Sequence, residues 1–340
     1  MRQTILQSSW IVGLLLLFIA STSMHPGDLK RFEINGYAQG TTYKVTYYAA
    51  DSLVTQSQTD SLLAAIDSSV SLYRPASLIL KFNHSEKGIS VDHHFAVLVK
   101  KALEINRETG GLVDITVKPL VDAWGFGANK TTAFPDSAKV KAILKHVGGN
   151  KIRLKGEFLY KSDPQVQIDL NGIAQGYTAD LLAGLLDKNG IHNYVAEIGG
   201  ELRIKGRKPD GEPFRIGIEA IDDNDIHPSP LQMVIAPGNA AVTTSGNYRK
   251  HLQANGRQIS HIIDPKTGYP SQTDIISVTV VAKDGITADG LDNGFVTMGM
   301  RQALDFIAKR GNLAAYIIYK KPNGSIADTA TSNFKAIEVK

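Results

Sequence analysis

The segment QIDLNGIAQGYTAD, residues 167–180, is central to the prediction of the fold. It predicts a strand over residues 166–170, then a turn at Gly172, then a helix over residues 172–189. Glycine tolerates the backbone conformations that a tight strand-to-helix turn requires. Runs rich in apolar and β-branched residues then predict strands over residues 194–198, 201–206, 214–221, 231–235 and 240–244. Strand groups separated by helices, without a repeated strand–helix–strand unit, indicate an α+β fold.

The rest of the chain extends this pattern in both directions. Upstream, alternating residues predict a hairpin over residues 32–48, and helical spacing predicts helices over residues 52–72, 94–110 and 138–146, followed by a strand over residues 152–159. Downstream we expect strands over residues 258–263, 276–282 and 314–319, helices over residues 287–300 and 301–310, and an edge strand over residues 334–339. Residues 222–230 are the best candidate for a mobile loop, and no internal repeat or linker divides the chain.

Composition excludes several function classes. The 340 residues are 43% hydrophobic and 21% charged, which is ordinary for a globular protein. A net charge of +4, evenly spread, is too small to indicate a nucleic-acid partner. The chain has no cysteine, so disulfides, thiolate metal sites and a cysteine nucleophile are excluded.

The N-terminus predicts export. Arg2 precedes an apolar run over residues 10–20, and the small polar residues 21–23 follow it. This is the pattern of a secretory signal peptide, and the run is shorter than the roughly 20 apolar residues that span a bilayer. We therefore expect a signal peptide at residues 1–23 and one domain at residues 24–340, with an uncleaved anchor as the alternative. Either way, the body of the protein is expected in the periplasm or attached to the outer face of the inner membrane.

Two segments carry residues suited to a polyphosphate and a hard cation. Asp169 ends a predicted strand, and Gly172 and Gly176 let the backbone of the next helix approach a ligand with its free N–H groups. Asp289 and Asn293 are four residues apart on a predicted helix, so their oxygens face the same way. Oxygen ligands together with substrate phosphates are what Mg²⁺ prefers.

A candidate base lies in the segment SHIIDPKTGYP, residues 260–270, where His261 is close in sequence to Asp264. The stretch from Asp264 to Gly268 also has the composition of a tight turn, and a lone histidine is more often structural than catalytic. The sequence has neither a Walker A loop nor a GxGxxG motif, so a P-loop or a dinucleotide-binding fold of that kind is not supported.

Structural alternatives stay open for the other residues as well. Asp114 can be a helix N-cap rather than a ligand contact. Gly199 and Gly200 are more typical of a distorted strand than of a phosphate cradle. Asp289 and Asn293 alone would usually form a solvated helix face. The number and order of the segments, more than any one of them, favour a functional site.

Taken together, these segments resemble the ApbE family of FAD:protein FMN transferases, from about Gly36 to Gly299. The most specific of them is HIIDPKTG at residues 261–268. The matching motifs, in chain order, are YRPAS with FN (73–83), DITV (114–117), IDL with GYTAD (168–180), GG (199–200), TSGNY (244–248), HIIDPKTG and AD (288–289).

The resemblance implies a bilobal α+β architecture, similar to the T-fold, with the flavin cleft between the lobes. It implies Mg²⁺-dependent transfer of FMN from FAD to a Ser or Thr hydroxyl, with release of AMP. The acceptor implied is an exported protein with a motif like D-x-x-[ST]-G-[AST], typically a subunit of a redox pump. An FAD pyrophosphatase and a non-catalytic flavin-binding protein remain as alternatives.

The resemblance also implies residue roles. His261 matches the residue expected to help deprotonate the acceptor hydroxyl, and Tyr73 matches an aromatic residue that packs on the flavin. The expected metal ligands are the Gly172 carbonyl, Asp289 and Asn293. The expected FAD contacts are Gln39, Tyr73, Leu112, Val113, Asp114, Asp169, Gln175 and Ile263.

Two positions depart from the pattern of the family. The family usually has Lys or Glu where this chain has Gln175, so one charged contact with the cofactor is lost. It usually has Ser-Thr where this chain has Asp292-Asn293. An amide oxygen can replace a hydroxyl as a Mg²⁺ ligand, so we expect the metal site to be retained.

Overall fold

The computed structural model describes residues 29–127, 134–221, 231–246, 251–254 and 257–339. The predicted signal peptide at residues 1–23 and the predicted mobile loop at residues 222–230 lie outside the described residues. Within the described part of the chain, no helix is long and apolar enough to cross a membrane.

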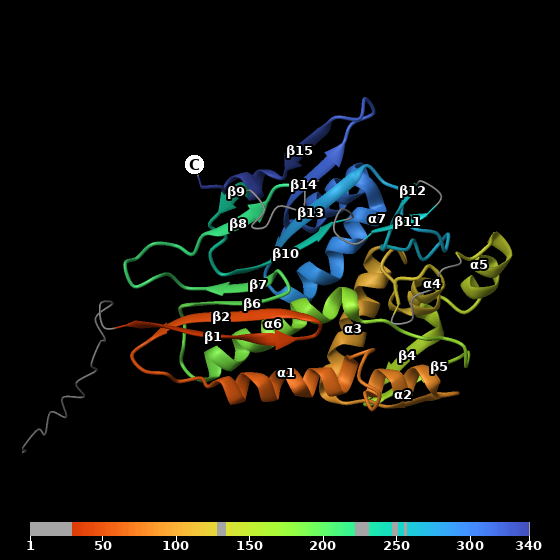
Figure 1. Ribbon diagram of the computed structural model, residues 1–340, viewed down its shortest axis with the longest axis horizontal. Coiled ribbons are helices and arrows are strands. Elements are labelled where there is room, and N and C mark those ends of the chain that lie inside the picture. The colour runs from red at the N-terminus through yellow and green to blue at the C-terminus, as the bar shows by residue number, and fades with distance from the viewer. Residues whose placement is uncertain (1–28, 128–133, 222–230, 247–250, 255–256, 340) are drawn as a thin grey trace, which may run out of the picture.

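One antiparallel sheet of eight strands organises the molecule (Figure 1). Its strands alternate between buried and exposed residues, as in β2, where Tyr43, Val45 and Tyr47 are buried. The expected α+β class is therefore confirmed. In spatial order the strands are β1 (Lys30–Ala38), β2 (Thr41–Ala49), β6 (Tyr194–Ile198), β7 (Glu201–Lys205), β10 (Ala240–Gly246), β13 (Ile275–Ala282), β14 (Ala314–Lys320) and β15 (Ile326–Ala330).

Two long helices pack against each other and against this sheet: α6 (Asn171–Lys188) and α7 (Gly285–Arg310). At Gly299 the backbone leaves the helical conformation with a φ of 72°, which bends α7 close to the predicted boundary between two helices. The other helices surround α6 or cap the ends of the molecule (Figure 1). They are α1 (Gln56–Val70), α2 (Leu78–His84), α3 (His93–Glu108), α4 (Lys118–Ala123), α5 (Ser137–Leu144) and α8 (Ser332–Lys335).

Smaller sheets and 3₁₀ turns complete the fold. The three-stranded sheet lies beside α2 and α3 (Figure 1). Its strands are β3 (Gly88–Ser90), β5 (Phe158–Lys161) and β4 (Ile152–Lys155). Two hairpins pair β8 (Ile216–Glu219) with β9 (Leu231–Ile235), and β11 (His251–Ala254) with β12 (Arg257–Ser260). The 3₁₀ turns are η2 (Ile115–Val117) and η3 (Gly149–Lys151).

The prediction of a strand at residues 166–170 is wrong, because side chains, and not a neighbouring strand, form hydrogen bonds with the backbone of this segment. The amide of Asn83 donates to the Ile168 carbonyl (3.0 Å) and accepts from the Ile168 N–H (2.7 Å). The buried ammonium of Lys161 donates to the Val166 carbonyl (3.0 Å). Since every buried backbone group needs a partner, these contacts replace a sheet ladder.

Two other predictions are corrected. The strand predicted at residues 152–159 is a hairpin, β4–β5, that turns at Gly156 with a φ of 58°. The edge strand predicted at residues 334–339 begins instead as the short helix α8, and only an isolated bridge joins Glu338 to Ile235. The other predicted elements exist with boundaries shifted by a few residues.

Candidate active site

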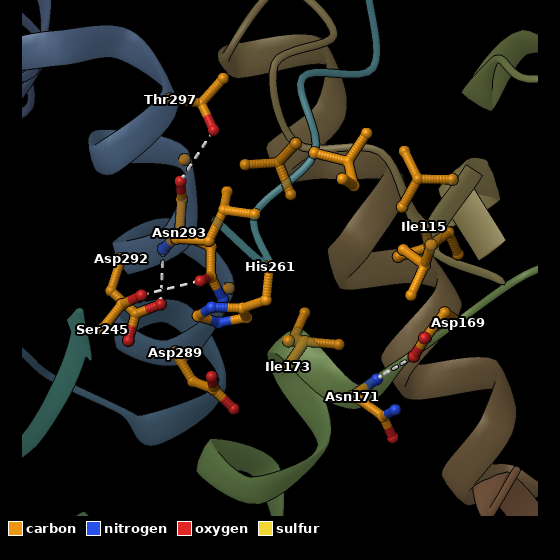
Figure 2. A pocket seen from close by; sticks show the side chains of 18 of the residues that line it. Ile115, Asp169, Asn171, Ile173, Ser245, His261, Asp289, Asp292, Asn293 and Thr297 are labelled. Atoms are coloured by element: carbon orange, nitrogen blue, oxygen red, sulfur yellow. Dashed lines mark hydrogen bonds between the residues drawn. The ribbon is translucent and has the colours of Figure 1, made fainter. Parts of the chain in front are cut away.

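A cavity of about 440 Å³ lies between the N-terminal parts of α6 and α7, the loop before η2 and the segment after β12 (Figure 2). It brings together all of the predicted site residues except Gln39. They are Tyr73, Leu112, Val113, Asp114, Asp169, Gly172, Gln175, His261, Ile263, Asp289 and Asn293. Residues that are up to 220 positions apart in the sequence, such as Tyr73 and Asn293, therefore line one cavity.

Gln39 is not among the residues that line this cavity. It lies in the turn between β1 and β2 with a φ of 53°, and its side-chain amide donates to the Thr178 hydroxyl on α6 (2.8 Å). Its buried side-chain oxygen has no hydrogen-bond partner within the described part of the chain. The structure therefore places Gln39 against α6 rather than in the cavity wall.

Close contact between α6 and α7 fixes one side of the cavity. A Cβ at Gly176 would lie 2.2 Å from the Gly285 carbonyl oxygen and 2.5 Å from the Asp289 Cβ. The expectation that Gly176 makes room for a ligand is therefore wrong: it makes room for α7. Gly172 does line the cavity, and its non-helical φ and ψ of −86° and 20° interrupt the first turn of α6.

Three buried carboxylates gather on this side of the cavity. Asp289, Asp292 and Glu201 are 4%, 2% and 8% exposed, and all line the wall. Burial raises the pKa of the Asp289 carboxyl to about 7. Burial first, and then the charge of Asp289, raises the pKa of Asp292 and of Glu201 well above their ordinary values. Buried carboxylates without a cation are costly, so this wall is suited to a positively charged ligand.

The hydrogen bonds of these acids leave acceptor capacity unused. One oxygen of Asp289 accepts the Gly176 N–H (2.7 Å). One oxygen of Glu201 is buried without a hydrogen-bond partner among the residues described. No Lys or Arg is among the described residues that line the cavity. No set of three or more His, Cys, Asp or Glu side chains in the described ranges is arranged to hold a metal ion. A metal here would therefore depend on Asp289 together with neutral oxygens.

Asn293 supplies such an oxygen only after a change of its amide orientation. Its oxygen accepts a hydrogen bond from the Ser245 hydroxyl (2.7 Å; Figure 2). Its nitrogen faces Gly172. The two ends of an amide have nearly the same shape, and a serine hydroxyl both donates and accepts. Rotating the amide by 180° keeps the bond to Ser245 and turns the oxygen toward Gly172, which is the arrangement that the predicted metal site requires.

His261 lies on the same side of the cavity as Asp289 and Asn293 (Figure 2). The Phe126 ring stands edge-on to it, with 6.3 Å between ring centroids. The nearby Asp264 has another role, because its carboxylate accepts from the Lys266 N–H (2.8 Å) and the Thr267 hydroxyl (3.1 Å). The tight turn considered for this segment is therefore present, and it begins three residues after His261.

On the opposite side, Asp114 organises the wall. Its carboxylate accepts from the N–H (2.8 Å) and hydroxyl (2.6 Å) of Thr116, so it caps η2 as the structural alternative proposed. The second oxygen accepts from the Gly149 N–H (2.7 Å) and the Asn106 amide (3.2 Å). A carboxylate with these partners holds the loop in place, and a contact of that carboxylate with FAD would compete with them.

The hairpin turn between β6 and β7 adds two features. Gly199 and Gly200 have φ values of 65° and 104°, which fit the strand distortion considered for them. They bring Glu201, immediately after the turn, into the cavity wall. Sequence reasoning missed Glu201, Ser245 and Phe126 as site residues. The signals available were the TSGNY motif for Ser245 and, for Glu201, an acid directly after a glycine pair.

The cavity therefore has the residues of several separate motifs in one place. The family model that matches this chain, described as the ApbE family, covers residues 39–317. The chain belongs to the ApbE family.

Relatives and solved structures agree with this assignment. The FAD:protein FMN transferase of Vibrio cholerae is 35% identical, over 96% of this chain and 98% of the relative. The protein of the same name from Haemophilus influenzae is 34% identical, over 92% of this chain and 93% of its own length. The flavin transferase ApbE structure from Vibrio cholerae superposes with a TM-score of 0.82, over 91% of this chain and 99% of that chain, at 35% identity. The apo flavinyl transferase ApbE of Pseudomonas stutzeri also gives a TM-score of 0.82, over 91% and 97% of the two chains, at 29% identity. The ApbE-like bilobal α+β architecture is thus confirmed.

The first testable consequence for this ApbE-family chain concerns Asp169. It lies in the cavity wall, and burial raises the pKa of its carboxyl to about 6, although Lys118 and the Asn171 N–H oppose this. The folded state therefore binds a proton more tightly than the unfolded state. The ionised carboxylate destabilises the metal-free fold above about pH 6, and this penalty disappears as the pH falls below about 4.

We expect Asp169→Asn to stabilise the metal-free protein by about 1–2 kcal/mol at pH 8 and by almost nothing at pH 4. Asparagine keeps the acceptor for the Asn171 N–H (2.8 Å). Urea unfolding in EDTA at the two pH values measures the difference. Equal stabilisation at both values would show that ionisation of Asp169 is not its cause.

The second consequence concerns Tyr73, which lines the cavity yet is 69% exposed. A ring at the cavity mouth can stack on a flavin, and aromatic pairs contribute about 0.5–1.5 kcal/mol beyond their area burial. We expect Tyr73→Ala to weaken FAD binding at least about threefold while Mg²⁺ binding is unchanged. Tyr37→Ala is the matched control, since Tyr37 is 73% exposed and does not line the cavity. Fluorescence titration with FAD that gives the same affinity for both variants would contradict this role.

Proposed function

We propose that this ApbE-family chain transfers FMN from FAD to a Ser or Thr hydroxyl of an acceptor protein, with Mg²⁺ and with release of AMP. The observation that carries the proposal is the cavity that joins His261 to Asp289 and to the positions expected to contact FAD. The names of its relatives support flavin transfer.

The charges of the cavity fit Mg²⁺. A pyrophosphate is anionic, while the described wall offers buried carboxylates and neither Lys nor Arg. The residues that would hold the ion are Asp289, the Gly172 carbonyl and Asn293, with Asp292 and Glu201 adding negative charge. When bound, Mg²⁺ supplies the positive charge that offsets the pyrophosphate and its leaving group.

The proposed step is one displacement at phosphorus. The acceptor oxygen forms a bond to the phosphorus on the FMN side, and the bond from that phosphorus to the bridging oxygen breaks, so that AMP leaves with the bridging oxygen. His261 takes the proton of the acceptor hydroxyl, which is a poor nucleophile near neutral pH. Phe126, against the His261 ring, restricts the orientations of the imidazole. Tyr73 and the loop before η2 hold the flavin half.

The test is incubation of the purified protein with FAD, Mg²⁺ and a peptide that contains D-x-x-T-G-A, followed by mass spectrometry and AMP assay. We expect the peptide to gain one FMN and an equal amount of AMP to appear. A matched peptide with Ala in place of the acceptor Thr should stay unmodified. Free FMN and AMP with an unmodified peptide would instead indicate an FAD pyrophosphatase, and bound but intact FAD would indicate a non-catalytic binder.

We further propose that the protein acts outside the cytoplasm, on an exported acceptor such as a redox-pump subunit. The apolar run at residues 10–20 and the small residues after it support this proposal. Cell fractionation with N-terminal sequencing of the mature protein tests it. A cytoplasmic protein that keeps residues 1–23 would contradict it.

A further inference from the structure

A second cavity, of about 540 Å³, lies behind the loop that forms one wall of the first. It is bordered by α3, η3 and the β4–β5 hairpin, and its lining shares no residue with the first cavity. Asn106 and Gly149 line it, and both donate hydrogen bonds to Asp114, which lines the first cavity. The two cavities are therefore separate spaces on opposite sides of one hydrogen-bonded partition.

The second cavity is cationic. Lys100 and Arg107 from α3 and Arg153 from β4 line it, and no acidic residue is among the described residues of its lining. Lys100 and Arg107 are seven positions apart, which places them on the same helix face. None of the three forms an ion pair with another residue that the structure describes.

The acids nearest in sequence do not neutralise these cations. On α3, Glu104 pairs with Lys101 (2.9 Å) and Glu108 pairs with Arg310, so both acids are already engaged. Glu157, in the turn between β4 and β5, is exposed and does not line the cavity. The positive charge at this cavity is thus available to a ligand.

Besides the cations, the lining has the apolar residues Leu103, Ile152 and Leu154 and the amide side chains of Asn106 and Asn150. A cavity with an apolar surface and a few convergent polar groups is typical of a small-molecule site. Guanidinium groups match the oxygens of a phosphate in a bidentate manner, and a lysine ammonium binds a phosphate as a point charge.

We propose that this cavity binds a phosphate group attached to a small organic moiety, either in a soluble phosphate ester or in the headgroup of an anionic lipid. The proposal does not depend on FMN transfer. In metal-free protein an anion should bind only at the second cavity. Without a metal, the described lining of the first cavity has carboxylates and neither Lys nor Arg, so it should repel an anion.

The experiment titrates the mature protein in EDTA and 0.15 M salt with glycerol phosphate, followed by calorimetry and ³¹P NMR. We expect saturable binding of one equivalent. The double variant Arg107→Gln/Arg153→Gln should weaken it at least about tenfold, because each lost charged hydrogen bond has an effect of that order. Lys155→Gln is the matched control: Lys155 is exposed on the same hairpin, carries the same charge and does not line the cavity. It should change the affinity less than about twofold.

Flotation with phosphatidylcholine vesicles, with and without phosphatidylglycerol, distinguishes the two sources. Flotation that requires phosphatidylglycerol and is lost in the double variant would identify a lipid headgroup. Glycerol phosphate binding without flotation would identify a soluble ester.

Arg153 also lies over the Tyr160 ring at 5.8 Å, so the single variants Arg107→Gln and Lys100→Gln check that any loss is not caused by an altered hairpin. The proposal is overturned if metal-free protein binds neither probe, or if the double variant binds glycerol phosphate as tightly as the parent.

Discussion

Asp289→Ala is expected to lower the Mg²⁺-dependent rate of FMN transfer by on the order of 10³-fold, since a lost metal interaction removes several kcal/mol of transition-state stabilisation. Asp289 is the only carboxylate among the proposed ligands, and it is 4% exposed, so water cannot easily replace it. AMP release measured over a Mg²⁺ titration gives the rate and the metal dependence together.

Two variants separate the charge of Asp289 from its structural contact. Asp289→Asn keeps an oxygen for the Gly176 N–H but removes the charge, so it should fold and still lose most activity. Asp305→Ala removes an exposed acid from the same helix and should leave the rate unchanged. Full Mg²⁺-dependent turnover by Asp289→Ala would place the metal elsewhere, and Asp292 would be the next residue to replace.

His261→Ala is expected to lower FMN transfer about 10²- to 10⁴-fold, the usual contribution of a general base. FAD affinity should change much less, because the flavin is expected to bind through Tyr73 and the loop before η2. Single-turnover transfer to the acceptor peptide, alongside FAD titration, measures both quantities. His192→Ala is the control, since His192 is exposed and outside the cavity. Wild-type transfer by His261→Ala would mean that another group, or the acceptor itself, deprotonates the hydroxyl.

Local patterns predicted the elements of this fold well where neighbours in sequence decide the structure. Helical spacing located α1 and α3, the glycine turn located the start of α6, and alternation located the β1–β2 hairpin. The segment at residues 166–170 failed for the opposite reason. Its backbone carbonyls accept hydrogen bonds from the side chains of Asn83 and Lys161 instead of pairing with a strand. Both side chains belong to other segments, so the periodicity of residues 166–170 could not predict these bonds.

The sequence predicted those site residues that belong to recognisable motifs. Every predicted site residue but Gln39 lines one cavity. The engagement of the Asp114 carboxylate with Gly149 and Asn106 depends on packing between remote loops, so the sequence could not show it. For the same reason Glu201, buried without a hydrogen-bond partner in the described structure, was not predicted as part of the wall.

The position of β2 beside β6 has a consequence for how the chain reaches its native state. These neighbouring strands are separated in sequence by the whole stretch from residue 50 to residue 193. During synthesis the β1–β2 hairpin must wait for the later strand, and an isolated hairpin is marginally stable at best. The helices and the β4–β5 hairpin encoded in between can form from local contacts first, while the large sheet forms late and slowly. If the chain crosses a membrane while unfolded, this delay is an advantage, because the sheet cannot close before most of the polypeptide has emerged.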